Sequence, residues 1–186
     1  MISHFNEAIL QEIRIVKIAL VGYMGSGKST IGKLLSKDLA SSFLDLDEVI
    51  EDGLGDSISN VFKTHGEIFF RKKEHQYLNE VLTEKNNFIL STGGGTPCYS
   101  GNMETMLAMA DYVFYLKVSI PGLAERLIKE KDHRPLIKNI PNDELPEFIG
   151  KHLFERNNYY LKAPYIITCD HKEPQEIVEE IKGLLR

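Results

Sequence analysis

The stretch Gly22–Thr30, GYMGSGKST, decides the fold of this chain. It matches the pattern G-x-x-x-x-G-K-[ST], and it lies between an apolar, β-branched run (Ile15–Val21) and a helical pattern (Ile31–Leu39). Its glycines allow successive backbone N–H groups to point at one anion, and the N-terminus of the following helix favours negative charge. The stretch therefore predicts a loop that binds the phosphates of a nucleoside triphosphate.

Individual residues of this loop have separate expected roles. Lys28 reaches the β- and γ-phosphates, and the Ser29 hydroxyl is placed to ligate Mg²⁺. The whole set of expected nucleotide-binding residues in the loop is Gly25, Ser26, Gly27, Lys28, Ser29 and Thr30. The motif identifies a phosphate donor but says nothing about the acceptor.

Short apolar runs alternate with helical patterns along the rest of the chain. The strand candidates are residues 15–21, 43–46, 88–91, 112–116 and 165–168, and the helix candidates are residues 31–39, 58–82 and 175–185. This order predicts an α/β fold with a parallel sheet covered by helices on both faces. Ligands of such sheets bind beyond the carboxyl ends of the strands, which is where we expect the chemistry.

Composition limits the class of protein. With 186 residues and 42% hydrophobic content, we expect one compact domain over residues 1–186. The formal net charge of -5 argues against nucleic acid or a membrane surface as the main partner and favours a small ligand. No apolar window approaches the roughly 20 residues of a membrane span, so we expect a cytoplasmic protein. Cys98 and Cys169 are expected to be free thiols, and the six histidines lack metal-ligand spacing.

Two segments fall outside the alternating pattern. Residues 1–14 read as an extra amphipathic helix. Residues 129–150, rich in charge, proline and asparagine, read either as a lid over the site or as an ordinary solvated loop.

Asp45 and Asp47 lie two residues apart where the second strand candidate ends. If the extended geometry persists, both carboxylates project to the same side near the phosphate loop. One carboxylate can then serve Mg²⁺ while the other accepts the proton of an attacking hydroxyl. The alternative is an acidic helix start with Asp47 as the N-cap.

The stretch HGEIFFRKKE offers a second anion-binding element. Arg71 next to aromatic residues can clamp a carboxylate through two parallel N–H bonds, which a lysine cannot match. Arg71 and Glu74 are also spaced for an ordinary surface ion pair, and the nearby phenylalanines are equally well explained as core.

The stretch Ser91–Pro97, STGGGTP, places three glycines after the third strand candidate. At the same sheet edge as the phosphate loop, bare backbone can approach a second molecule within hydrogen-bond distance. We expect an acceptor cradle here, with a merely permissive turn as the alternative. Arg134 in HRPLI and Arg156 in ERNNYYLKAPY supply further cations, either for the transferring phosphoryl group or as plain surface charge.

Taken together, these elements resemble the shikimate kinase family, within the nucleoside-monophosphate-kinase-like P-loop group. The resemblance runs in order over about residues 15–185 and rests on GYMGSGKST, DLD, SISNVFKTHGEIFFRKKE, STGGG, RPLI and an Arg-x-x-x-Tyr at Arg156 and Tyr160. It implies a three-layer P-loop sandwich with a five-stranded parallel sheet in the order 2-3-1-4-5 and a mobile lid. It also implies phosphorylation of the 3-hydroxyl of shikimate by ATP with Mg²⁺, in the pathway to chorismate, by a monomeric enzyme.

The resemblance further implies a role for each matching residue. Asp47 would deprotonate the acceptor hydroxyl, and Arg134 would stabilise the transferring phosphoryl group from the lid. Asp45 and Ser29 would serve Mg²⁺. The residues implied for shikimate are Asp47, Arg71, Arg156, Gly93, Gly94, Gly95, Phe62 and Phe70.

One departure from the family and two other functions stay open at this level. Arg126, the nearest match to the family's adenine-stacking arginine, is one place off register, with Lys129 and Lys131 as alternatives. A different small-metabolite kinase, such as a gluconate kinase, shares the phosphate loop without needing a carboxylate clamp. A non-catalytic nucleotide-binding module would need neither paired carboxylates nor clamping arginines.

Overall fold

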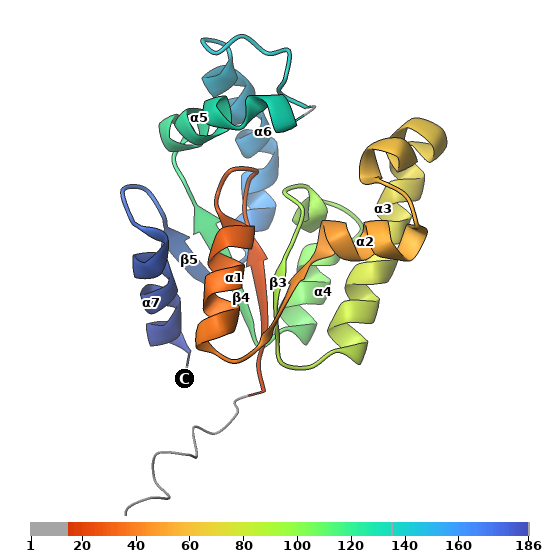
Figure 1. The fold of residues 1–186 in the computed structure, drawn as a ribbon, viewed down its shortest axis with the longest axis vertical. Helices are drawn as coiled ribbons and strands as arrows, with labels where there is room; N and C mark the ends of the chain where they lie inside the picture. Colours follow the sequence, from red (N-terminus) through yellow and green to blue (C-terminus); the bar gives the residue numbers. More distant parts are fainter. Residues whose placement is uncertain (1–14, 135, 186) are drawn as a thin grey trace, which may run out of the picture.

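A computed structural model of the chain describes residues 15–134 and 136–185 (Figure 1). The expected helix over residues 1–14 lies outside the described residues. In chain order the elements are β1 (Lys17–Val21), α1 (Lys28–Asp38), β2 (Ser42–Asp45), α2 (Leu46–Leu54), α3 (Ile58–Glu84), β3 (Phe88–Ser91), the 3₁₀ turn η1 (Thr96–Cys98), α4 (Asn102–Met109), β4 (Tyr112–Lys117), α5 (Ile120–Lys129), η2 (Lys131–His133), α6 (Leu145–Tyr160), β5 (Tyr165–Thr168) and α7 (Pro174–Leu184).

The five strands form one parallel sheet in the order β2-β3-β1-β4-β5, which confirms the predicted topology. In the central strand, Ala19 lies opposite Leu90 of β3 and Val113 of β4. Residues Ile18 to Val21 are fully buried. Strands covered on both faces read as continuous apolar runs, which is why the sequence revealed them.

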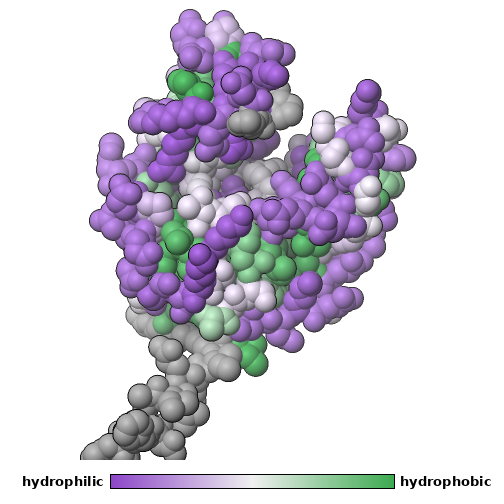
Figure 2. All heavy atoms as spheres, viewed as in Figure 1, coloured by the Kyte–Doolittle hydropathy of each residue, from purple (hydrophilic) through white to green (hydrophobic). Residues whose placement is uncertain are grey.

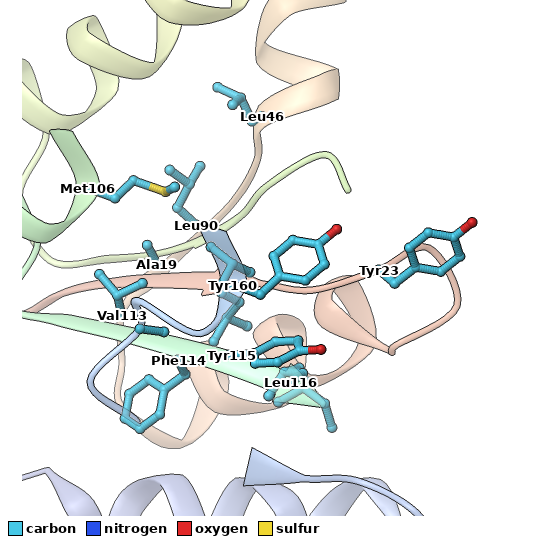
Figure 3. Close-up of a cluster of buried hydrophobic side chains, with 14 of the residues drawn as sticks. Ala19, Tyr23, Leu46, Leu90, Met106, Val113, Phe114, Tyr115, Leu116 and Tyr160 are labelled. Carbon is cyan, nitrogen blue, oxygen red and sulfur yellow. The ribbon is translucent and has the colours of Figure 1, made fainter. Parts of the chain in front are cut away.

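Helices cover both faces of the sheet. Figure 1 shows α1 and α7 together on one face and α4 on the other, with α3 beside α4. Figure 3 shows the packing at the carboxyl ends of the strands, where the rings of Tyr115 and Tyr160 lie next to each other with centroids 5.1 Å apart. The core therefore extends up to the sheet edge at which the phosphate loop begins.

The long helix α3 contains an interruption that its apolar pattern did not predict. Gly66 has φ 79° and ψ 174°, so the helix is two segments joined at a kink. Only glycine adopts this backbone conformation without strain. The kink sets the turn carrying Phe62 at an angle to the segment carrying Arg71.

The segment expected to be a lid is only partly loop. Within residues 129–150, η2 and turns come first, and α6 begins at Leu145. The side chains of Ile137, Leu145 and Ile149 are fully buried, so the segment is anchored in the core at these points. Across residues 15–134 and 136–185, none of the helices combines the length and apolarity needed to cross a bilayer.

Candidate functional site

A cavity of about 540 Å³ opens at the carboxyl ends of β1, β2 and β3. Figure 2 shows the surface hollowed between the α5–α6 end of the molecule and α2. The lining contains the predicted loop residues Gly25 to Thr30 together with Asp45, Asp47, Gly93, Gly94 and Arg134. Three strand ends thus bring most of the expected residues into one space.

The phosphate loop is built around Lys28. This side chain is buried, and its Nζ donates to the carbonyl oxygens of Gly22 (2.9 Å) and Tyr23 (3.0 Å). Burial lowers the pKa of Lys28 to about 8, against the opposing effect of the Asp47 and Asp45 carboxylates. The loop therefore holds a cation whose charge is poorly hydrated and available to an anion.

Ser29 and Asp45 form the oxygen-rich corner of the cavity. The Ser29 hydroxyl donates to Asp45 Oδ2 at 2.8 Å and lies 3.2 Å from the Ser91 hydroxyl. Asp45 Oδ1 accepts from the Asp47 backbone N–H and caps α2. The capping alternative thus applies to Asp45 rather than to Asp47.

The structure corrects the route by which Asp47 reaches the cavity. The chain turns into α2 at Leu46, so the extended geometry does not persist and the two carboxylates do not alternate along one strand. Asp47 still lines the cavity, from the first turn of the helix. Burial, reinforced by the Asp45 and Glu74 carboxylates, raises the pKa of Asp47 to about 6. A carboxylate with this pKa is a much better proton acceptor near neutral pH than an ordinary one.

The glycine run is where three side chains crowd against bare backbone. A methyl group built on Gly93 would come within 2.9 Å of Asp47 Oδ1, and one on Gly95 within 3.0 Å of the Arg71 guanidinium. A methyl group on Gly94 would lie 3.7 Å from Arg156 Nη1. The glycines therefore give room to the functional side chains as well as to a ligand.

Arg71 lies behind this loop and does not line the 540 Å³ cavity. Its Nη1 donates to Glu74 Oε2 at 2.8 Å, and its guanidinium stacks 3.9 Å from the Tyr99 ring centroid. Burial alone would lower the pKa of Arg71, but Glu74 outweighs it and the net pKa is raised. Arg71 and Glu74 therefore do form the ion pair that their spacing allowed. The pair is not an ordinary surface pair, because the Glu74 side chain is 1% exposed.

The two phenylalanines differ in burial. Phe70 is buried, Phe62 is 36% exposed, and their rings lie 4.5 Å apart across the Gly66 kink. Neither residue lines the nucleotide cavity. Phe70 accordingly belongs to the core, while Phe62 presents an open apolar face beside Arg71's helix.

Arg156 and its neighbours on α6 connect the glycine run to the phosphate loop. The Arg156 guanidinium lies 5.5 Å from the Tyr23 ring centroid, and the Tyr23 hydroxyl hydrogen-bonds His152 Nδ1 at 3.0 Å. The Tyr160 hydroxyl donates to the Gly94 carbonyl oxygen. Burial followed by the Arg156 charge lowers the pKa of His152, which favours the neutral imidazole.

The α5 end of the cavity carries further cations. Arg134 lines the cavity and pairs with Glu130, and Arg126 donates to the carbonyl oxygens of Gly25 (3.3 Å) and Cys169 (3.1 Å). Arg126 thus reaches the nucleotide cavity despite its shifted place in the sequence. Lys129 also lines the cavity, whereas Lys131 does not.

Sequence reasoning missed several residues of the site. Lys172, Pro174 and Ile177 line the cavity from the loop after β5 and the start of α7. Their position beyond the carboxyl end of a parallel strand was the available signal. Cys98 and Cys169 are free thiols, as expected, and burial raises the pKa of Cys98 to about 11, which keeps this thiol protonated near neutral pH.

Comparison with known proteins agrees with this geometry. A family model described as shikimate kinase matches residues 24–186. A shikimate kinase of Flavobacterium psychrophilum is 52% identical over 170 residues, covering 91% of this chain and 98% of the relative.

Solved structures give the same result. The crystal structure of a shikimate kinase from Bacteroides thetaiotaomicron has a TM-score of 0.86 and 36% identity, covering 92% of this chain and 99% of the other. A shikimate kinase from Acinetobacter baumannii in complex with shikimate has a TM-score of 0.82 and 30% identity, covering 92% and 93%. The resemblance seen in the motifs is confirmed, and the chain belongs to the shikimate kinase family.

Proposed function

We propose that this chain transfers the γ-phosphoryl group of ATP to the 3-hydroxyl of shikimate, using the residues of the cavity and of the adjoining glycine run. The observation that carries the proposal is the position of Asp47. It lines the same cavity as Lys28, and its Oδ1 lies where a side chain on Gly93 would point, just as Arg71 and Arg156 lie beside the next two glycines. Nucleotide and acceptor sites therefore adjoin at a carboxylate with a raised pKa.

On the nucleotide side, the backbone of residues 25–30 binds the β- and γ-phosphates, with Lys28 as the charged partner. Lys28 leaves its loop carbonyls for the phosphate oxygens, which are stronger acceptors because they are charged. Arg134 exchanges Glu130 for the transferring group, where it stabilises charge that develops in the transition state. Residues 129–150 act as the lid that excludes water.

The Ser29–Asp45 corner fits Mg²⁺. Hydroxyl and carboxylate oxygens are the ligands that Mg²⁺ prefers, and this ion is commonly held by few protein groups together with substrate phosphates and water. Among the described residues no cluster of three or more His, Cys, Asp or Glu side chains forms a dedicated metal cage, which suits that mode of binding. When bound, the ion neutralises phosphate charge; Ser29 and Asp45 orient it.

On the acceptor side, Arg71 and Arg156 bind the shikimate carboxylate, and Gly93, Gly94 and Gly95 lie along its ring. Phe62 forms the exposed apolar wall, and the buried Phe70 supports it from behind, with the two rings 4.5 Å apart. With the acid fixed in this way, its 3-hydroxyl faces Asp47. The Asp47 carboxylate accepts the hydroxyl proton while the oxygen bonds to the γ-phosphorus, and the bond to the β–γ bridging oxygen breaks to release ADP.

The smallest test is a coupled assay of ADP release with MgATP and no acceptor, shikimate or gluconate. We expect turnover with shikimate alone and a phosphorylated product. Turnover with gluconate would favour the other kinase class, and tight nucleotide binding without turnover on any acid would favour the non-catalytic module. The monomeric state implied by the resemblance and the cytoplasmic location expected from the sequence remain predictions.

A further inference from the structure

The acceptor clamp is supported by a buried polar network that the roles above do not use. Several polar side chains among the described residues are buried. Apart from those in the phosphate loop, in α1 and at the end of β3, they are Glu74, Thr96 and Asn102, which are 1%, 0% and 0% exposed. They come from α3, from η1 directly after the glycine run, and from the first turn of α4. All three lie in one hydrogen-bonded chain.

Glu74 is the link between this network and Arg71. One carboxylate oxygen, Oε2, accepts from Arg71 at 2.8 Å, and the other, Oε1, accepts from the Thr96 hydroxyl at 2.7 Å. A buried carboxylate needs donors on both oxygens. Thr96 therefore supplies the second donor, which fixes the Glu74 carboxylate in the rotamer that holds Arg71.

Thr96 is itself fixed by the fold around it. Its backbone N–H donates to the Gly93 carbonyl oxygen at 3.1 Å, and its carbonyl oxygen accepts from Asn102 Nδ2 at 2.9 Å. Asn102 Oδ1 lies 2.7 Å from His75 Nδ1, so the ring donates there. Because Glu74 and His75 are neighbours in α3, the chain of hydrogen bonds closes on itself and ties two adjacent residues of α3 to Thr96, directly after the glycine run, and to Asn102 at the start of α4.

We propose that Thr96 is a positioning residue of the acceptor site. Its hydroxyl orients Glu74, Glu74 fixes the Arg71 guanidinium against Gly95, and Arg71 then meets the acceptor carboxylate without rearranging; Asn102 keeps Thr96 in place. This inference rests on the proposed function, because it assigns Arg71 to the carboxylate. It also explains why a buried threonine, Thr96, follows the three glycines. A turn that served only to let the chain bend would not need a buried hydroxyl at this position.

The test is Thr96→Val, which keeps the side-chain shape and removes the donor. We expect KM for shikimate to rise about tenfold, with kcat changed less than threefold and KM for MgATP unchanged. Calorimetric titration with shikimate should show the same loss of affinity. Thr96→Ser, which restores the hydroxyl, should recover most of it.

Two controls separate positioning from a general loss of packing. Thr105→Val makes the same chemical change at a hydroxyl that donates to the carbonyl oxygen of Gly101, the residue before its own helix, and it should leave all constants unchanged. In a Glu74→Gln background, Thr96→Val should add little further loss, because both residues act through one guanidinium. A melting curve for each variant shows that it is folded.

The proposal is overturned if Thr96→Val leaves KM for shikimate unchanged, if it raises KM for both substrates equally, or if Thr96→Ser is as impaired as the valine variant. Fully additive losses in the Glu74→Gln background would also overturn it. These outcomes presuppose an active parent enzyme. Absence of shikimate-dependent turnover in the parent would instead contradict the proposed function.

Discussion

The two sides of the site hold their cations in different ways. On the nucleotide side, Lys28 rests on carbonyl oxygens of its own loop, within nine consecutive residues, Gly22–Thr30. On the acceptor side, Arg71 depends on Glu74, which in turn depends on Thr96 from another segment. One arrangement is local and made by backbone, while the other is assembled by packing. Because the two arrangements share no hydrogen bond named above, we expect a substitution on the acceptor side to leave nucleotide binding intact, and a substitution on the nucleotide side to leave shikimate binding intact.

The largest expected effect is at Asp47, where the two sides meet. Asp47→Asn removes the proton acceptor while keeping the side-chain shape, so kcat should fall by about 10³-fold, within the range typical of general bases. The affinity for an ATP analogue, measured by calorimetry, should change less than twofold. Turnover near the parent level would show that Asp47 is not the proton acceptor. Loss of nucleotide binding would show that Asp47 is also needed on the nucleotide side.

Arg71→Lys tests the independence of the acceptor side. A lysine keeps the charge but loses the planar pair of donors, so KM for shikimate should rise roughly 10- to 100-fold, with KM for MgATP unchanged. Steady-state kinetics with each substrate varied in turn measures both. Equal losses for the two substrates would contradict the assignment of Arg71 to the carboxylate.

Lys28→Met is the matched variant on the nucleotide side. It keeps an extended side chain of similar length and removes the charge. Nucleotide affinity should be lost while calorimetry still detects shikimate binding. If shikimate binding disappears as well, the two sides are not separable and the comparison fails.

Asp47 should also affect stability in a pH-dependent way. Its folded-state pKa lies above the unfolded value of 3.8, so the folded state binds the proton more tightly, and stability from this group falls as pH rises through about 6. The rise in the pKa of Asp47 from 3.8 to about 6 corresponds to at most about 3 kcal/mol in the free energy of unfolding, and partial exposure reduces this to roughly 1–2 kcal/mol. Asp47→Asn should therefore be more stable than the parent at pH 7.5 by about that amount in urea unfolding. The gap should narrow toward pH 5, and a gap that widens there would contradict the sign.

The smallest effect is on the pH profile of the free enzyme. Asp47 must be unprotonated to accept a proton, so kcat/KM should fall about tenfold per pH unit below about 6. Lys28 must be protonated to bind phosphate, so kcat/KM for MgATP should also fall above about 8. In Asp47→Asn the acidic limb should vanish from the residual activity while the alkaline limb stays. If Asp47→Asn lost the alkaline limb and kept the acidic one, the assignment of the acidic limb to Asp47 and of the alkaline limb to Lys28 would be wrong.

The sequence predicted the fold and the nucleotide side because both are encoded in contiguous stretches. Buried parallel strands are apolar without interruption, and the phosphate loop needs its glycines and Lys28 at fixed spacing. The glycine run was likewise recognised from its place after β3. The expected residues at these strand ends line one cavity, apart from Gly95.

The acceptor side was less predictable, because its decisive property is burial. An Arg71–Glu74 pair has the same spacing whether it faces water or the core, and only packing against η1 makes it buried. Asp45 caps α2 and redirects Asp47, which period-two reasoning could not foresee. Arg126 reaches the cavity because a long side chain tolerates a one-residue shift along a helix.

The kink at Gly66 has a consequence for ligands larger than shikimate. A methyl group built on Gly66 meets nothing within 4 Å, so the bend requires glycine for its backbone angles and not for its small size, and the space beside it is open. Phe62 lies on one side of this bend and is 36% exposed, while Arg71 lies on the other side and is held by Glu74. Inhibitors that keep a carboxylate and grow toward Phe62 should therefore gain room without giving up their anchor.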